Sequence, residues 1–182
     1  LINGNAFTGW SSLSNVVIPD NVTSLGYGVF YACTGLVSVN IGNGVESIGG
    51  RAFSKCTSLK KVIIGNGLTE IQASAFENCE SIDGVFINDI AAWCNIAFED
   101  DSSNPLFYTK DLYVREGGNY ELLTELVIPD GVTKINDYAF QGCTRIKSVV
   151  IPASLLRIGE YAFSNCTELT GVYISDIAAW FN

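Results

Sequence analysis

Six cysteines and one short acidic run are the side chains whose types and spacing could do chemistry in this chain. A thiolate can act as a nucleophile or a metal ligand, and clustered carboxylates can exchange protons or bind a hard cation. The sequence contains no His, so the commonest general base and metal ligand is missing. Asp and Glu fall mostly in turns, with no visible convergence. We therefore predict that the chain has no catalytic residues.

Five of the six cysteines recur at one position, three residues after a repeated Phe. They are Cys33, Cys56, Cys79, Cys143 and Cys166. Equivalent residues on paired neighbouring strands lie about 4.8 Å apart, so distance alone permits disulfides between them. We favour the other interpretation, in which they are buried free thiols that act as small apolar side chains. Cys94 lies outside this column, and the spacings match no zinc-binding pattern.

The acidic run comprises Glu99, Asp100 and Asp101. Because hard cations prefer clustered carboxylates, one interpretation is a calcium-binding loop. The run lacks the glycine-punctuated spacing of known calcium loops, and solvated acidic loops are common, so we favour the solvated loop. We predict neither a bound metal nor a cofactor.

Charge and hydropathy exclude several classes of function. The 182 residues include 10 Lys and Arg against 19 Asp and Glu, a net charge of −9, which argues against binding nucleic acid or an anionic membrane surface. No apolar run reaches the roughly 18 residues that a membrane helix needs. Hydrophobic residues make up 48% and charged residues 16% of the chain, which indicates an ordered fold.

A repeat of 23 residues organises the sequence. Its marker is a Phe that recurs in step at Phe7, Phe30, Phe53 and Phe76, and again at Phe140 and Phe163. A period of this length predicts a solenoid, in which each repeat forms one rung of a stack. The alternating stretch in each repeat reads as a short strand, with Val39 and Ile41 pointing inward in the second repeat, and turn residues follow it. The Phe-x-x-Cys portion reads as a helical or 3₁₀ turn on the opposite side.

We therefore predict an α/β, strand-rich solenoid of about seven such rungs with a parallel β-sheet, interrupted by one insert of a helix and a hairpin. The predicted parts of this single domain are repeats at 1–88, the insert at 89–125, repeats at 126–175 and the start of a second insert at 176–182. Asp89 is expected to cap the helix, and Gly117-Gly118 to form the hairpin turn. Trp93 is interpreted as a core anchor, with a sugar-stacking role as the alternative. The run Asp89 to Trp93 recurs at Asp176 to Trp180, so we expect the chain to be part of a longer array.

The repeat resembles the BspA-like (Treponema-type) leucine-rich repeats. The shared pattern is V-x-x-I-x-x-x-A-F-x-x-C-x-x-L-x-x-V-x-I-P, and this chain departs from it at Val29, Trp10, Gly42 and Gly65. The resemblance implies a curved, right-handed solenoid on secreted or cell-surface proteins, mostly bacterial, that take part in adhesion and in host or matrix binding. It supplies no catalytic residues.

Strand alternation also predicts a candidate binding surface. The outward residues of the strands form a mostly apolar column, and Lys61 belongs to a second column beside it. The column comprises Val17, Asn40, Ile63, Phe86, Val127, Val150 and Tyr173. Exposed apolar stripes often mark partner binding. Two alternatives stay open: β-branched residues simply favour strands, or the insert folds over the column.

Three functions follow from these observations. The first is a non-catalytic module of a secreted or cell-surface bacterial protein that binds a protein or glycan partner, such as a host or matrix component. The second is a structural spacer that displays another domain. The third, an enzyme, would need carboxylate pairs, a lysine or a thiolate in place of His, and we set it last.

Overall fold

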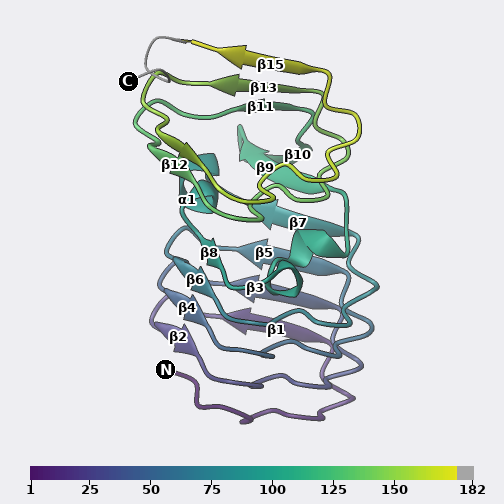
Figure 1. Cartoon of the computed structure of the whole chain (residues 1–182). Helices are drawn as coiled ribbons and strands as arrows, with labels where there is room; N and C mark the ends of the chain where they lie inside the picture. The colour runs from purple at the N-terminus through teal and green to yellow at the C-terminus, as the bar shows by residue number, and fades with distance from the viewer. Residues whose placement is uncertain (176–182) are drawn as a thin grey trace.

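The computed structural model describes residues 1–175 as one stack of rungs (Figure 1). The predicted second insert at 176–182, including Trp180, lies outside the described residues. Each rung contributes a short strand to a main sheet on one side, and most contribute an even shorter strand to a second sheet.

The first rungs build a parallel main sheet. Its strands are β1 (Asn15–Ile18), β3 (Ser38–Ile41), β5 (Lys61–Ile64) and β7 (Gly84–Ile87). Each residue pairs with the one 23 positions further on, as in Val16 with Val39. Val39 and Ile41 are buried, as the alternation predicts.

A second parallel sheet lies across the core. It consists of the two-residue strands β2 (Ser24–Leu25), β4 (Ser47–Ile48), β6 (Glu70–Ile71) and β8 (Ala97–Phe98). The apolar member of each strand is buried, so the two sheets enclose one continuous core.

The last described rungs repeat this arrangement. The main-sheet strands β11 (Glu125–Val127), β13 (Ser148–Ile151) and β15 (Gly171–Ile174) form a separate three-stranded parallel sheet, and β12 (Lys134–Ile135) pairs with β14 (Arg157–Ile158). The predicted parallel-sheet solenoid is confirmed. The main sheet, however, is split between β10 and β11 instead of running unbroken along the chain.

Stacked phenylalanines run through the core. Phe7 and Phe30 stack with ring centroids 5.3 Å apart and planes 7° from parallel. Phe30 on Phe53 and Phe53 on Phe76 stack at 5.4 and 5.2 Å. Because the rings occupy equivalent positions one rung apart, this ladder confirms the 23-residue register.

The Phe-x-x-Cys portion is a chain of separate hydrogen-bonded turns with a left-handed residue inside each, so the predicted helical or 3₁₀ turn is wrong. The Cys33 N–H donates to the Phe30 carbonyl at 3.1 Å, a single-turn bond that no helix continues. The residues two before and two after each repeat Phe have positive φ, and such residues end a right-handed helix. They are Asn5, Gly9, Gly28, Ala32, Arg51, Lys55, Ser74, Asn78, Tyr138, Gly142, Tyr161 and Asn165.

These left-handed positions turn the backbone toward the neighbouring rung. Ala32, with a φ of 55°, donates its N–H to the Ser54 carbonyl of the next rung at 2.8 Å. The strain that a Cβ causes at positive φ is therefore offset by rung-to-rung hydrogen bonds.

The insert begins with helix α1 (Ile90–Cys94), continues through the 3₁₀ turns η1 (Asp101–Ser103) and η2 (Pro105–Phe107), and ends in strands β9 (Leu112–Glu116) and β10 (Asn119–Leu122). As predicted, Asp89 caps α1 by accepting the Ala92 N–H at 2.7 Å. Strand β9 pairs in parallel with β7, and β10 returns antiparallel beside β9. The insert thus fills a rung of both sheets and adds one extra strand.

Buried side chains of the insert fasten it to the rungs that follow. Trp93 is buried and its Nε1–H donates to the Ala139 carbonyl at 2.8 Å, which confirms its role as a core anchor. The buried Asn104 side chain donates to the Tyr138 carbonyl at 2.8 Å.

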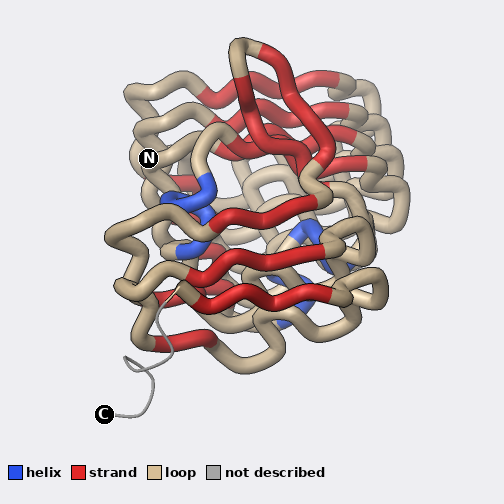
Figure 2. Tube along the Cα trace, turned by 90° about the horizontal axis from the view of Figure 1, so that it is seen from above, coloured by secondary structure: helices blue, strands red, loops and turns tan. Residues whose placement is uncertain are grey.

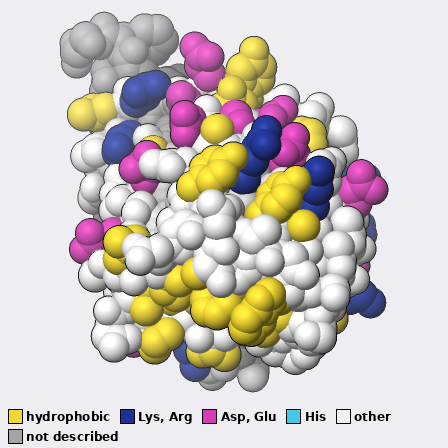
Figure 3. Space-filling model, turned by 90° about the horizontal axis from the view of Figure 1, so that it is seen from below, with side chains coloured by type: hydrophobic (Ala, Val, Ile, Leu, Met, Phe, Trp, Pro, Cys, Tyr) yellow, Lys and Arg dark blue, Asp and Glu magenta, His cyan; other side chains and the backbone are white. Residues whose placement is uncertain are grey.

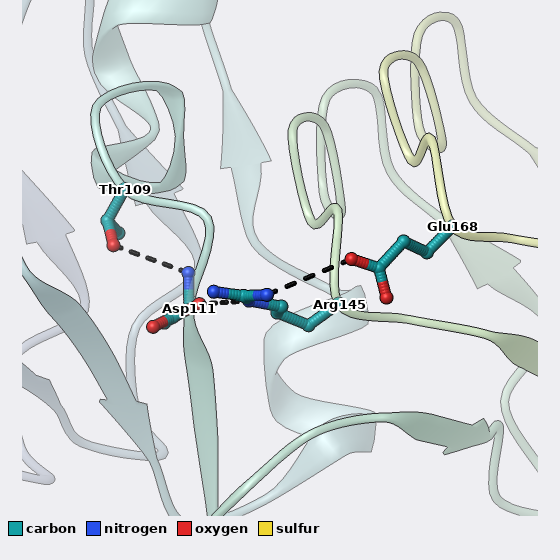
Figure 4. Close-up of polar contacts among 4 residues, drawn as sticks. All are labelled: Thr109, Asp111, Arg145 and Glu168. Carbon is teal, nitrogen blue, oxygen red and sulfur yellow. Dashed lines mark hydrogen bonds and ion pairs between the residues drawn. The ribbon is translucent and has the colours of Figure 1, made fainter.

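An ion-pair bridge at the surface joins the same parts of the chain. Arg145 lies between Asp111 of the insert, at 3.3 Å, and Glu168 of the next rung, at 3.8 Å (Figure 4). The Thr109 hydroxyl accepts the Asp111 N–H at 3.3 Å, so the carboxylate is held in position. Because the Arg145 side chain is 52% exposed, we expect this bridge to contribute little to stability.

Apolar side chains gather on the end of the stack at the first rung (Figure 3). Phe7 and Leu13 are half-buried there, and Trp10 is 55% exposed. No described rung covers this face, which shows how much each rung depends on a neighbour to bury its core residues.

The left-handed positions lead to a first prediction. Ala32→Gly should raise the free energy of unfolding by about 1 kcal/mol, because glycine adopts a φ of 55° without Cβ strain. The matched variant Ala52→Gly, at a buried position without positive φ, should lower it by roughly 1–2 kcal/mol. Urea unfolding followed by circular dichroism measures both values. Destabilisation of similar size in both variants would contradict the assignment of strain to position 32.

Candidate binding surface

The predicted outward column exists, but in two parts. Val17, Asn40, Ile63 and Phe86 pair in register across β1, β3, β5 and β7. The second part, on β11, β13 and β15, consists of Val127, Val150 and Tyr173. The expected single stripe is wrong, because β10 follows β9 in the first sheet and β11 starts a new one.

The hairpin of β9 and β10 covers Phe86. The Phe86 ring stacks on Tyr113 at 4.6 Å and 9°, and meets Tyr120 edge-on at 5.3 Å. A Cβ at the adjacent Gly84 would lie 2.8 Å from the Tyr113 ring, so only glycine leaves room for this stack. On the other side the Lys61 ammonium lies 4.5 Å from the centre of the Phe86 ring. Phe86 is therefore the base on which the hairpin is fixed.

The hairpin projects outward from the layer of parallel strands (Figure 2). Its turn is Gly117-Gly118, as predicted, with positive φ at both residues, as a tight two-residue turn requires. Alternation gives its two faces different chemistry. The register pairs Arg115 with Tyr120 on one face and Val114 with Glu121 on the other.

A groove of about 530 Å³ lies on the side of the hairpin that faces the first rungs; we call it the N-terminal groove. Val17, Asn40 and Ile63 line it from the sheet, and Arg115 and Tyr120 line it from the hairpin. The turns after the strands complete the lining with Asp20, Asn43 and Asn88. Three of the eight predicted site residues thus meet in one hollow.

Some polar groups of this groove are already engaged and others are free. The Tyr120 hydroxyl donates to Asn88 Oδ1 at 3.0 Å, and Asp20 Oδ1 accepts the Asn43 N–H at 2.6 Å. Within residues 1–175, no hydrogen bond or ion pair engages the side chains of Asn40 and Arg115. A planar amide and a guanidinium are therefore available to a ligand.

A second groove, of about 340 Å³, lies between the other face of the hairpin and β11; we call it the acidic groove. Its charged lining consists of Glu116, Glu121 and Glu125, and its apolar lining includes Val114 and Val127. Val127 is thus the predicted site residue that belongs to this groove. Val150 and Tyr173 lie further along the same sheet, where Tyr173 is 62% exposed.

Comparison with protein families gives one clear result. The BspA type leucine rich repeat region matches the chain in six copies, over residues 1–104 and 119–180. The chain belongs to the BspA-type leucine-rich repeat family. The part between the matched ranges, residues 105–118, contains η2, β9 and the two-residue turn of the hairpin.

Solved structures similar to this BspA-type chain are also leucine-rich repeat proteins. A leucine rich cell surface protein from Faecalibacterium prausnitzii A2-165 is 26% identical, with a TM-score of 0.42, and the match covers 94% of this chain and 64% of that one. A leucine-rich repeat protein from Bacteroides ovatus ATCC 8483 is 23% identical, with a TM-score of 0.52 and coverage of 89% and 45%. The chain therefore spans less than two thirds of either protein. No curated protein sequence matches it.

In this BspA-type stack the cysteines are structural. All six are buried and free, which confirms the prediction of free thiols. The Cys56 Sγ–H donates to the Phe30 carbonyl at 3.2 Å, and Cys79 makes the equivalent bond to Phe53 at 3.1 Å. Burial raises the pKa of Cys79 and of Cys94 to about 12, so neither provides a thiolate near neutral pH.

The acidic run has a structural role of its own. Asp100 Oδ1 accepts the Ser103 N–H at 2.6 Å, and its Oδ2 accepts the Ser74 N–H of the preceding rung at 3.0 Å. Glu99 Oε2 accepts the Ala73 N–H at 2.8 Å. Asp100 takes the place of a backbone acceptor, since the equivalent Arg51 N–H donates to the Ala73 carbonyl, and Glu99 takes the place of the Gln72 side chain, which accepts the Gly50 N–H. Among residues 1–175, no group of three or more His, Cys, Asp or Glu side chains is arranged to hold a metal ion.

Two residues that line the N-terminal groove are not predicted from the sequence as members of a site. Arg115 and Tyr120 were assigned only to a hairpin, because nothing showed over which strands that hairpin would fold. The alternation of residues 113–122 around Gly117-Gly118 is the signal from which the chemistry of the two faces of the hairpin could have been derived.

Among the described residues, no helix has both the length and the apolar character that a membrane span requires.

The raised thiol pKa values predict how stability depends on pH. The pKa of Cys79 is about 12 in the folded chain and about 8.5 in an unfolded one, so the unfolded chain loses this proton first as pH rises. The stabilisation is complete below about pH 8.5 and is lost between there and about pH 12, at about 1.4 kcal/mol per pH unit for this thiol. Urea unfolding at a series of pH values, for the wild type and Cys79→Ala, isolates the contribution of Cys79 from that of the tyrosines. Equal slopes for the two proteins would contradict the burial of a neutral thiol.

Proposed function

We propose that this chain is a non-catalytic binding module of a secreted or cell-surface bacterial protein, and that it holds a protein or glycan partner in the N-terminal groove. The observation that carries the proposal is the groove itself, a hollow on the outer face of the sheet with one wall made by the hairpin. Its volume of about 530 Å³ lies in the usual range for ligand sites. Membership of the BspA-type family supports the proposed location.

The lining suits contact with an extended surface or a chain of sugars. Val17 is 71% exposed and, with Ile63, offers an apolar floor. The Asn40 amide, on the floor, offers a donor and an acceptor, and the Arg115 guanidinium, on the hairpin wall, offers donors. Both have the planar geometry that pairs well with carboxylates, amides and vicinal hydroxyls. Tyr120 adds an aromatic face beside them. An apolar floor with a few convergent polar groups is the usual composition of a binding site.

Three observations support a non-catalytic role. The sequence has no His. The buried thiols are neutral, as the raised pKa values of Cys79 and Cys94 indicate. Glu99 and Asp100 are engaged by backbone N–H groups. These thiols and these two carboxylates are therefore committed to the fold.

A structural spacer is the alternative. A spacer needs only stacked rungs. Strand β9 serves stacking because it pairs with β7, whereas β10 is an extra strand that no rung requires. The packing of Phe86 between Lys61, Tyr113 and Tyr120, which fixes the hairpin over the sheet, favours the binding module.

The test is to screen the chain against arrays of glycans and of extracellular-matrix proteins and to measure the hits by calorimetry. Asn40→Trp, which fills the groove, and Arg115→Glu, which reverses its charge, should each weaken binding by about tenfold or more. Leu156→Ser is the control: it changes an exposed apolar residue outside both grooves and outside the predicted column, and should leave the affinity unchanged.

Wild-type affinity in both folded groove variants would remove the N-terminal groove as the site. Failure of the wild type to bind any member of either array would instead favour the spacer. Circular dichroism and thermal melting show whether each variant is folded.

A further inference from the structure

We propose a second site: the acidic groove takes an extended peptide segment rich in Lys or Arg, which adds as a strand to the free edge of β11. The proposal rests on the edge of β11 and on the groove beside it. It is independent of the N-terminal groove.

Strand β11 is paired on one side only. The Thr124 carbonyl accepts the Lys147 N–H at 2.7 Å, and the Ile128 N–H donates to the Val150 carbonyl at 3.0 Å. Because alternate residues of a strand face the same neighbour, residues 124, 126 and 128 face β13. The N–H and C=O groups of Glu125 and Val127 therefore point the opposite way. In the described part of the chain, β11 has no pairing partner on that side.

The hairpin leaves this edge open. Strand β10 pairs only with β9, and the Leu123 N–H, just after β10, donates back to the Leu112 carbonyl at 2.8 Å. The chain then enters β11 without pairing it to β10. The space between them is the acidic groove, with Glu125 and Val127 on one wall and the Val114 and Glu121 face of the hairpin on the other. An unpaired edge beside an open hollow is the arrangement in which a peptide adds as a strand.

The charge of the walls selects the occupant. The groove contains the three carboxylates Glu116, Glu121 and Glu125 and no Lys or Arg. A strand edge is normally protected from pairing with a second copy by such charges, and this chain, with a net charge of −9, would be repelled here. A basic segment is attracted by the same carboxylates. Val114, Leu122 and Val127 provide apolar contacts for the alternate side chains of such a strand.

The experiment uses a fluorescein-labelled peptide of alternating Lys and Val, titrated with the whole chain and followed by fluorescence anisotropy. Val127→Pro removes the N–H that points to the free edge and breaks no bond to β13, since proline is tolerated on the open side of an edge strand. It should weaken binding by about tenfold, whereas Val127→Thr, which keeps the N–H, should change it by less than about threefold.

Charge variants and modified peptides complete the test. Glu121→Gln should weaken binding by about threefold and reduce its salt dependence, while Glu46→Gln, at an exposed carboxylate outside the groove, should leave both unchanged. A peptide with Glu in place of Lys should not bind. A Lys-Val peptide with methylated backbone nitrogens should lose binding to the wild type, a result that does not depend on whether Val127→Pro folds.

Three outcomes would overturn the proposal. One is no binding of the Lys-Val peptide at about millimolar concentration. Another is equal binding of the methylated peptide, which would show adsorption by charge without strand addition. The third is full affinity in Val127→Pro, provided that circular dichroism shows the variant folded.

Discussion

The stacking of identical backbone segments at one strand spacing is the constraint on which the whole structure depends. Every rung must present its N–H and C=O groups, its Phe ring and its left-handed turns in the same place as the rung before it. The Phe rings stack 5.2–5.4 Å apart along the first four rungs. The pairing in β1, β3, β5 and β7 keeps a constant 23-residue offset. Any departure from the repeat must therefore replace the contacts that it removes.

The insert meets this constraint by imitating a rung. It supplies β8 to one sheet and β9 to the other, and its side chains take over where the repeat pattern stops. Asp100 accepts a backbone N–H of the preceding rung, and Trp93 and Asn104 donate to carbonyls of the following one. Its extra strand, β10, has no counterpart in the repeat. Both grooves and the free edge of β11 arise from that one strand, so the features available for binding are concentrated where the repetition is broken.

Much of the fold could be predicted from the sequence, because a repeat supplies the same information several times. The 23-residue period predicts that Phe7 lies over Phe30 in the next rung, and the turn residues predict where the strands end. The cap at Asp89 and the turn at Gly117-Gly118 follow from local preferences, which need no knowledge of the rest of the chain. The Cys column was recognised as core for the same reason: its members share one position in every rung.

The candidate site was predicted less well, because it depends on contacts between segments that do not repeat. The direction in which the hairpin folds is decided by the packing of Tyr113 and Tyr120 on Phe86, and no periodicity reports this contact. The split of the main sheet follows from the course of β10. Single-residue patterns also could not show that Glu99 and Asp100 would accept backbone N–H groups of another rung. The sequence therefore predicts the hairpin and the acidic run as elements, but not the residues of other rungs that each of them contacts.

Because its cysteines are buried and free, the folded stack does not depend on the redox state of its surroundings. In the assembled rungs the sulfur atoms are shielded from oxidants, and there is no disulfide that a reductant could cleave. The chain before assembly is in the opposite situation, since six reactive sulfurs then lie along a flexible polymer and can join in many combinations that the native stack never uses. In an oxidising compartment, correct folding therefore requires that each rung packs on its neighbour faster than its thiol forms a disulfide with another cysteine.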